Sequence, residues 1–127
     1  HKKVGFDLLR NIPYLEYRTR SSLQYQISHW LAENDLIDLN TVISTSRMDI
    51  LLAFVKAGIG WSIIPQMGLM HFPGYVQPLN WKDGKEPFCR NTSLLYRKEQ
   101  FQIPVISSFI EFALKYCSEI QYPELSI

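Results

Sequence analysis

The first half of the chain alternates between extended and helical spacing of its apolar residues. Residues 12–17 are rich in β-branched and aromatic side chains and predict a strand, with Pro13 tolerated near its start. A helix is predicted from Ser22 to about Glu33, and Ser21 has the position of its N-cap, in capping-box spacing with Gln24. Residues 41–45 predict a second strand. The apolar face of the predicted helix consists of Leu23, Ile27, Trp30 and Leu31.

The run from Ser46 to Pro65 predicts a helix, a tight turn and a strand in close succession. Ser46 is expected to cap the helix, with Asp49 completing a capping box. Gly58 is expected to end the helix in the left-handed conformation, and residues 61–64 then form a short apolar strand. Such a strand is typical of a parallel sheet covered on both faces. The order strand, helix, strand, helix, strand therefore predicts an α/β fold.

The remaining residues predict shorter elements and one long helix. Residues 66–70 predict a helical turn, and residues 76–79 an edge strand. Residues 80–90 are interpreted as a polar excursion, and residues 92–97 as a strand. A final helix is expected to begin at Pro104, before a tail at residues 122–127. Its predicted buried stripe consists of Ile106, Phe109, Ile110, Ala113 and Cys117.

Composition and motifs mainly indicate which classes of function are not expected. The 127 residues are 46% hydrophobic with a net charge of +1, so bulk charge gives no reason to expect a nucleic-acid or membrane surface. Cys89 and Cys117 are isolated and are expected to be reduced thiols of a cytoplasmic protein. The first residues lack the apolar core of a signal peptide. His29 has no second ligand at helical spacing, and the chain shows no nucleophile elbow, phosphate-binding loop or cofactor motif. We therefore expect no metal, no cofactor and no enzyme activity.

Three segments, in this order and spacing, resemble LysR-type transcriptional regulators. They are residues 7–9, residues 55–60 with Ile64–Pro65, and residues 94–98 followed by 105–112. The resemblance implies a mostly parallel sheet flanked by helices, forming one lobe of a type 2 periplasmic-binding-protein-like domain. Residues 1–90 would be the second lobe of the effector-binding domain, and residues 91–127 a returning strand, the final helix and the tail. The helix-turn-helix and the start of the first lobe, which the family also has, are not found in these residues.

The turns after the first two predicted strands carry hydroxyl and arginine side chains directly before a helix. In a parallel sheet, ligands bind beyond the carboxyl ends of the strands, where helix N-termini favour an anion. The resemblance implies that such turns bind a small anion between two lobes. Each serine has capping as its alternative role, and each arginine has simple solvation. The candidate effector-binding residues are Thr19, Arg20, Ser21, Ser22, Thr45, Ser46 and Arg47.

These observations predict the ligand-sensing domain of a LysR-type regulator. A small anionic effector would bias DNA binding, which occurs only through the absent N-terminal domain, and the chain is expected to form a homo-oligomer. Two alternatives stay open, namely a solute-binding protein working in transport and a small enzyme of the same α/β class. Trp30 and Trp61 are interpreted as core residues, with a ligand pocket as the alternative role.

Overall fold

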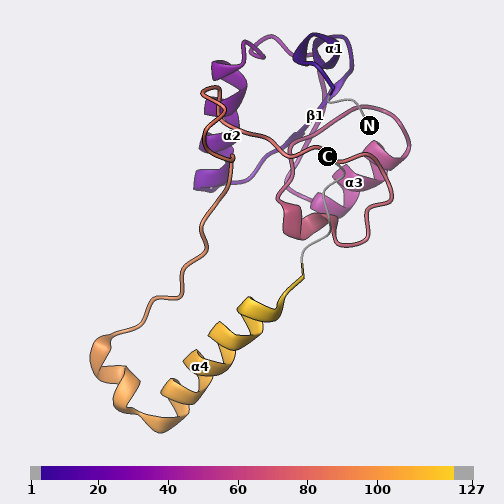
Figure 1. The fold of residues 1–127 in the computed structure, drawn as a ribbon. Helices are drawn as coiled ribbons and strands as arrows, with labels where there is room; N and C mark the ends of the chain where they lie inside the picture. The colour runs from indigo at the N-terminus through magenta and orange to yellow at the C-terminus, as the bar shows by residue number, and fades with distance from the viewer. Residues whose placement is uncertain (1–3, 122–127) are drawn as a thin grey trace. The chain divides into compact units, whose positions relative to one another are not determined.

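The computed structural model describes residues 4–121, and the chain divides between Cys89 and Arg90 into two compact units. The first unit contains α1 (Phe6–Arg10), β1 (Tyr14–Tyr17), α2 (Ser22–Glu33), β2 (Thr41–Thr45), α3 (Met48–Lys56) and the 3₁₀ turn η1 (Gln66–Leu69) (Figure 1). The second contains the 3₁₀ turn η2 (Lys98–Gln102) and α4 (Pro104–Glu119). The predicted tail at 122–127 lies outside the described residues. The lobe assignment of 1–90 and 91–127 stays a prediction.

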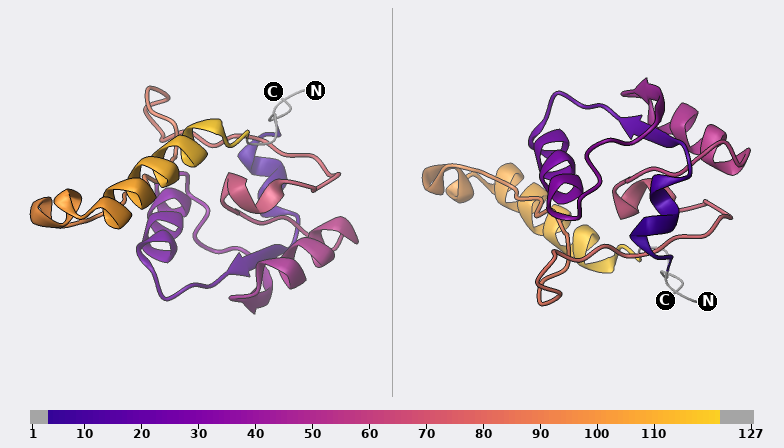
Figure 2. Two further views of the ribbon diagram at one scale, coloured as in Figure 1. Left: turned by 90° about the horizontal axis from the view of Figure 1, so that it is seen from below. Right: turned by 90° about the horizontal axis from the view of Figure 1, so that it is seen from above.

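The sheet of the first unit is small and parallel. β1 pairs with β2, from Tyr14 opposite Thr41 to Tyr17 opposite Thr45, with one irregularity after Tyr14. Trp61 adds a parallel bridge to Tyr14, so β1 lies between β2 and the start of the 61–64 segment. The helices α2 and α3 lie on different sides of these strands (Figure 2). The predicted parallel arrangement is therefore present as two strands and a bridge.

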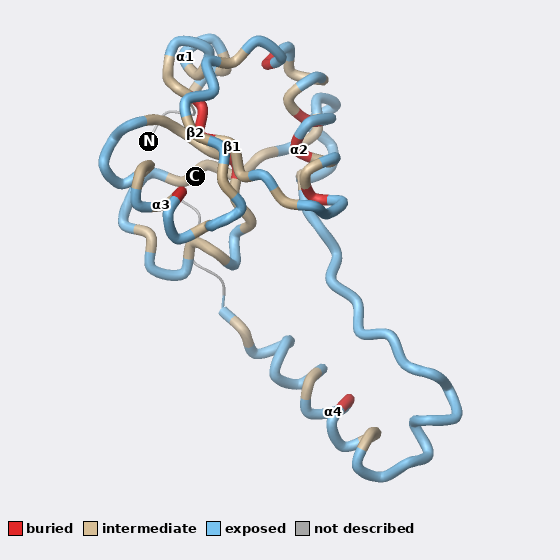
Figure 3. Tube along the Cα trace, turned by 180° about the vertical axis from the view of Figure 1, so that it is seen from behind, coloured by how far each residue is buried: buried red, intermediate tan, exposed pale blue. Residues whose placement is uncertain are grey.

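The core of the first unit forms between α2 and the chain that covers it. Leu23, Ile27 and Trp30 of α2 are buried together with Leu36 and Ile63 (Figure 3). The predicted core role of Trp30 is confirmed, because its side chain is fully buried and its indole Nε1–H donates to the carbonyl of Asn80 at 2.8 Å. Trp61 is partly buried and packs against the same cluster.

Three predicted strands are absent from the described residues. Residues 61–64 make one bridge, and residues 76–79 and 92–97 have no strand pairing. Residues 80–90 are more than a polar excursion, because Asn80 forms a β-bridge with Pro87. The Trp81 and Phe88 rings also pack edge to face beside the core, with their centres 4.9 Å apart. A strand needs a neighbouring strand to satisfy its backbone, so residues 76–79 and 92–97, which pair with no strand among the described residues, stay irregular.

The second unit confirms the start of the final helix and corrects its stripe. Pro104 is the first residue of α4, and Ile110 is its one buried residue. Of the other four predicted stripe residues, Ile106 and Ala113 are partly buried, while Phe109 and Cys117 are exposed. Helical spacing identifies a face that is able to pack, but burial also requires a surface opposite that face. None of the described helices is long and apolar enough to cross a membrane.

Candidate functional site

The parallel register brings the two hydroxyl-bearing turns to the same edge of the sheet. Tyr17 and Thr45, the last residues of β1 and β2, are partners, and the Arg18 backbone N–H continues the ladder to the Thr45 carbonyl at 2.9 Å. The turn that leads into α2 therefore begins beside the turn that leads into α3. The seven candidate residues lie in these two turns, at the last residue of β2 and at the first residue of α2.

The first turn is fixed by the side chain of Gln24. Its Oε1 accepts from the Thr19 backbone N–H at 3.2 Å, while the Thr19 and Ser21 hydroxyls bond to each other at 2.8 Å. Ser21 is the N-cap of α2, but its side chain makes no capping bond, so the predicted capping box is wrong. Arg20 and Ser22 are exposed, and the Arg20 side chain has no ion-pair or hydrogen-bond partner among residues 4–121. This turn presents hydroxyls and an uncommitted cation.

The second turn differs from its prediction in the identity of the cap. Arg47, not Ser46, is the N-cap of α3. The Thr45 hydroxyl accepts from the Arg47 backbone N–H at 3.1 Å, so the helix begins one residue later than predicted. Ser46 is exposed. The Thr45 side chain therefore organises the turn itself, and the predicted capping box of Ser46 and Asp49 is not formed.

Arg47 is already engaged by the carboxylate of Asp49. Its Nε and Nη2 donate to the two Asp49 oxygens at 3.1 and 2.6 Å, a bidentate pair on the surface. The hydrogen bond from Arg47 lowers the pKa of Asp49, and desolvation opposes this effect. The N–H group of Ile50, the charge of Arg47 and the N–H group of Asp49 add to the lowering. The same hydrogen bond raises the pKa of Arg47. An anion at this turn would compete with Asp49 for Arg47.

Glu16 is a contact residue of this region that the sequence did not single out as a site residue. Its Oε2 accepts from the Ser44 hydroxyl at 2.6 Å and pairs with Arg18 at 3.2 Å, and its Oε1 lies 3.5 Å from the Gln24 amide. Gln24 thereby connects Glu16 to the Thr19 backbone. Glu16 and Ser44 are register partners, each one residue before the end of its strand, so a carboxylate at the second-last position of the strand was the available signal. Glu16 therefore links the ends of both strands and the first turn in one network.

The same carboxylate contributes to the environment of Tyr14. Burial, and secondarily the charge of Glu16, raises the pKa of the Tyr14 hydroxyl well above its ordinary value. That hydroxyl is buried and has no hydrogen-bond partner among the described residues. The Tyr14 hydroxyl is therefore neutral in the folded chain at neutral pH.

The remaining candidates lie away from the two turns. His29 is exposed; its Nε2 lies 3.5 Å from a Glu33 carboxylate oxygen, and its ring centre lies 5.4 Å from that of Trp81. The described residues contain no group of side chains suited to a metal. Cys89 and Cys117 are free thiols. The arrangement at the turns offers hydroxyls, backbone N–H groups and the guanidinium groups of Arg20 and Arg47, which suits recognition of a small anion and provides no nucleophile–base pair.

The family model described as the LysR substrate binding domain matches residues 1–118. A curated relative, the uncharacterized HTH-type transcriptional regulator YraN of Bacillus subtilis (strain 168), is 29% identical over 112 residues. The match covers 87% of this chain and 38% of the relative, so the chain spans well under half of that protein's length. No solved structure matches the chain significantly.

Proposed function

We propose that this chain, which belongs to the LysR substrate-binding domain family, binds a small anionic effector at the turns after β1 and β2. The observation that carries the proposal is the parallel pairing of Tyr17 with Thr45, extended by the Arg18–Thr45 hydrogen bond. It places two sets of hydroxyl and backbone N–H groups at one edge of the sheet. An anion between them would satisfy groups that water otherwise satisfies.

The bound anion would act by favouring one arrangement of the domain over another. A ligand shifts such an equilibrium by its difference in affinity for the two arrangements. In a longer, homo-oligomeric protein, that bias would alter how a helix-turn-helix meets DNA. The printed description of the relative as an HTH-type transcriptional regulator supports this role. Family membership does not favour the alternative of a solute-binding protein in transport, and the family is not a class of enzymes.

The experiment is anion binding by the full-length protein. Sulfate, phosphate, acetate and citrate are screened by their effect on the melting temperature, and the anion with the largest effect is titrated calorimetrically. The double variant Thr45→Ala, Ser46→Ala should bind that anion with an affinity lower by about ten-fold or more. Hydrogen bonds to charged groups are each worth about 1.5–3 kcal/mol.

Ser118→Ala is the matched control. Its hydroxyl is exposed on α4 and bonds to the Lys115 carbonyl of its own helix, so this variant should leave the affinity unchanged. Equal affinity in the double variant and the parent protein would reject the assignment of the second turn.

A further inference from the structure

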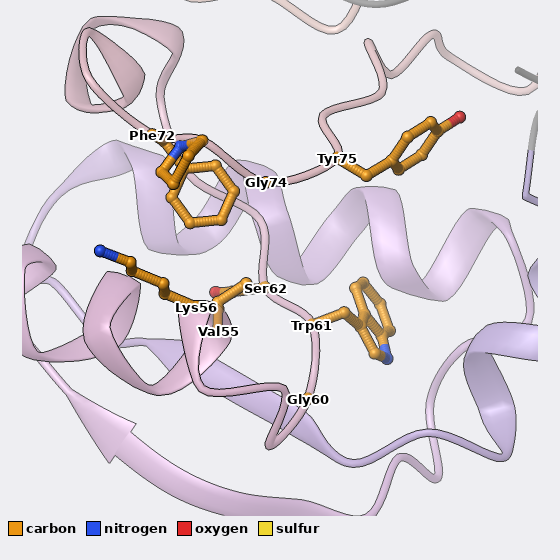
Figure 4. Close-up of a pocket in the computed structure, with 9 residues that line it drawn as sticks. Val55, Lys56, Gly60, Trp61, Ser62, Phe72, Gly74 and Tyr75 are labelled. Atoms are coloured by element: carbon orange, nitrogen blue, oxygen red, sulfur yellow. The ribbon is translucent and has the colours of Figure 1, made fainter.

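We propose a second small-molecule site in the first unit, which takes a planar aromatic ring carrying a carboxylate. The site is a cavity of about 430 Å³ between the end of α3, the 60–62 segment and the loop at 72–75 (Figure 4). Pockets that hold small ligands typically have volumes of about 300–1,000 Å³, so a single ring with one substituent fits. The residues that line the cavity are Val55, Lys56, Gly60, Trp61, Ser62, Phe72, Pro73, Gly74 and Tyr75.

This cavity lies at the opposite edge of the sheet from the two turns. Trp61 pairs with Tyr14, the first residue of β1, whereas the turns follow Tyr17 and Thr45, the last residues of their strands. Lys56 is the last residue of α3, the helix that begins at the second turn. The cavity shares no residue with the proposed effector site.

Trp61 forms a fixed wall of the cavity. Its indole Nε1–H donates to the Leu9 carbonyl at 3.1 Å, and the Tyr14 ring centre lies 4.8 Å from that of Trp61. Its backbone donates to the Pro13 carbonyl at 3.0 Å and accepts from the Leu15 N–H at 2.9 Å. Glycine is required at position 60, because a Cβ there would collide with the Pro13 carbonyl. An aromatic surface held in this way loses little conformational freedom when a ring stacks on it.

The charge of the lining selects an anion. Lys56 is the one charged residue among the nine, and it has no ion-pair partner among residues 4–121. Figure 4 shows Lys56 and Phe72 at one end of the cavity and Trp61 and Tyr75 at the other, with the Tyr75 hydroxyl directed away from it. A ligand with a ring at the Trp61–Tyr75 end and a carboxylate toward Lys56 matches both ends.

The test follows the indole N–H signals of the ¹⁵N-labelled chain during titration with benzoate. The Trp61 signal is identified by its loss in Trp61→Phe. Two matched probes are titrated in parallel: cyclohexanecarboxylate, which keeps the charge without the aromatic ring, and benzylamine, which keeps the ring and reverses the charge. Benzoate should shift the Trp61 signal saturably, with an affinity above that of either probe, while the signals of Trp30 and Trp81 stay in place.

Variants separate this site from a general effect of anions. Lys56→Gln should lower the affinity for benzoate about two- to five-fold, as expected for an exposed charge pair. Tyr75→Leu should lower this affinity by a similar factor. Lys82→Gln removes an exposed lysine elsewhere in the first unit and should change nothing. The proposal is wrong if the Trp61 signal does not saturate with benzoate, if the three probes bind equally, or if Lys56→Gln binds benzoate as the parent chain does.

Discussion

The two strand–turn–helix segments of the first unit have the same order of elements but differ in how each is held. The helix α2 buries Leu23, Ile27 and Trp30, whereas α3 buries Leu51 alone. The turn before α2 leaves Arg20 uncommitted, and the turn before α3 binds its arginine to Asp49. The first segment therefore combines a helix that buries three side chains with an arginine that has no partner among the described residues. The second combines a lightly buried helix with a cation that is already paired.

The largest expected effect comes from breaking the α2 core. Trp30→Ala should lower the free energy of unfolding by about 3–5 kcal/mol, because it removes a fully buried indole and its hydrogen bond to Asn80. Urea unfolding followed by circular dichroism measures the change. Tyr25→Ala, an exposed position of the same helix, should change it by less than about 0.5 kcal/mol. A loss at Trp30 as small as that at Tyr25 would contradict the proposed core.

A smaller effect is expected when the two arginines are compared. Arg20→Gln should lower the affinity for the anion selected by the melting screen by about five-fold or more, because the site loses an ionised hydrogen-bond donor. Arg47→Gln should weaken it less, since Arg47 must first be drawn from Asp49. Calorimetric titration of both full-length variants gives the ratio. A greater loss at Arg47 would reverse our ranking of the two turns.

The smallest expected effect is a dependence of stability on pH at Asp49. Arg47 lowers the pKa of this carboxyl in the folded chain, so its stabilising contribution is present above the unfolded pKa of about 4. That contribution is lost as the pH falls through the lower, folded pKa. The stability difference between the parent chain and Asp49→Asn should be constant from pH 5 to 7 and should shrink below pH 4. A difference that grows on acidification would show that the pair does not form.

The same contrast explains how far the sequence predicts the fold. The bounds of α2 and β2 and the start of α4 are confirmed, because helical periodicity, β-branched residues and Pro104 are local signals. The strands predicted at 76–79 and 92–97 depend on neighbouring strands that the described residues do not supply. Burial of Phe109 and Cys117 likewise needs an opposing surface, which periodicity within one helix does not reveal.

The sequence predicted the placement of the two turns but not their side-chain contacts, and effector binding at these turns stays a prediction. The rule that ligands bind beyond the carboxyl ends of parallel strands identified the two turns, and the register places them at one edge. The Thr45 hydroxyl, however, bonds within the turn, Asp49 holds Arg47, and Glu16 joins Ser44, Arg18 and Gln24. Such side-chain partners depend on three-dimensional distances that residue spacing does not encode.

The central claim is that one anion contacts both turns, and amide NMR of the ¹⁵N-labelled chain titrated with sulfate tests it most directly. We predict that the backbone N–H signals of Arg20–Leu23 and of Ser46–Met48 shift together, with one common dissociation constant. Shifts confined to one turn, or two turns that saturate at different sulfate concentrations, would contradict the claim.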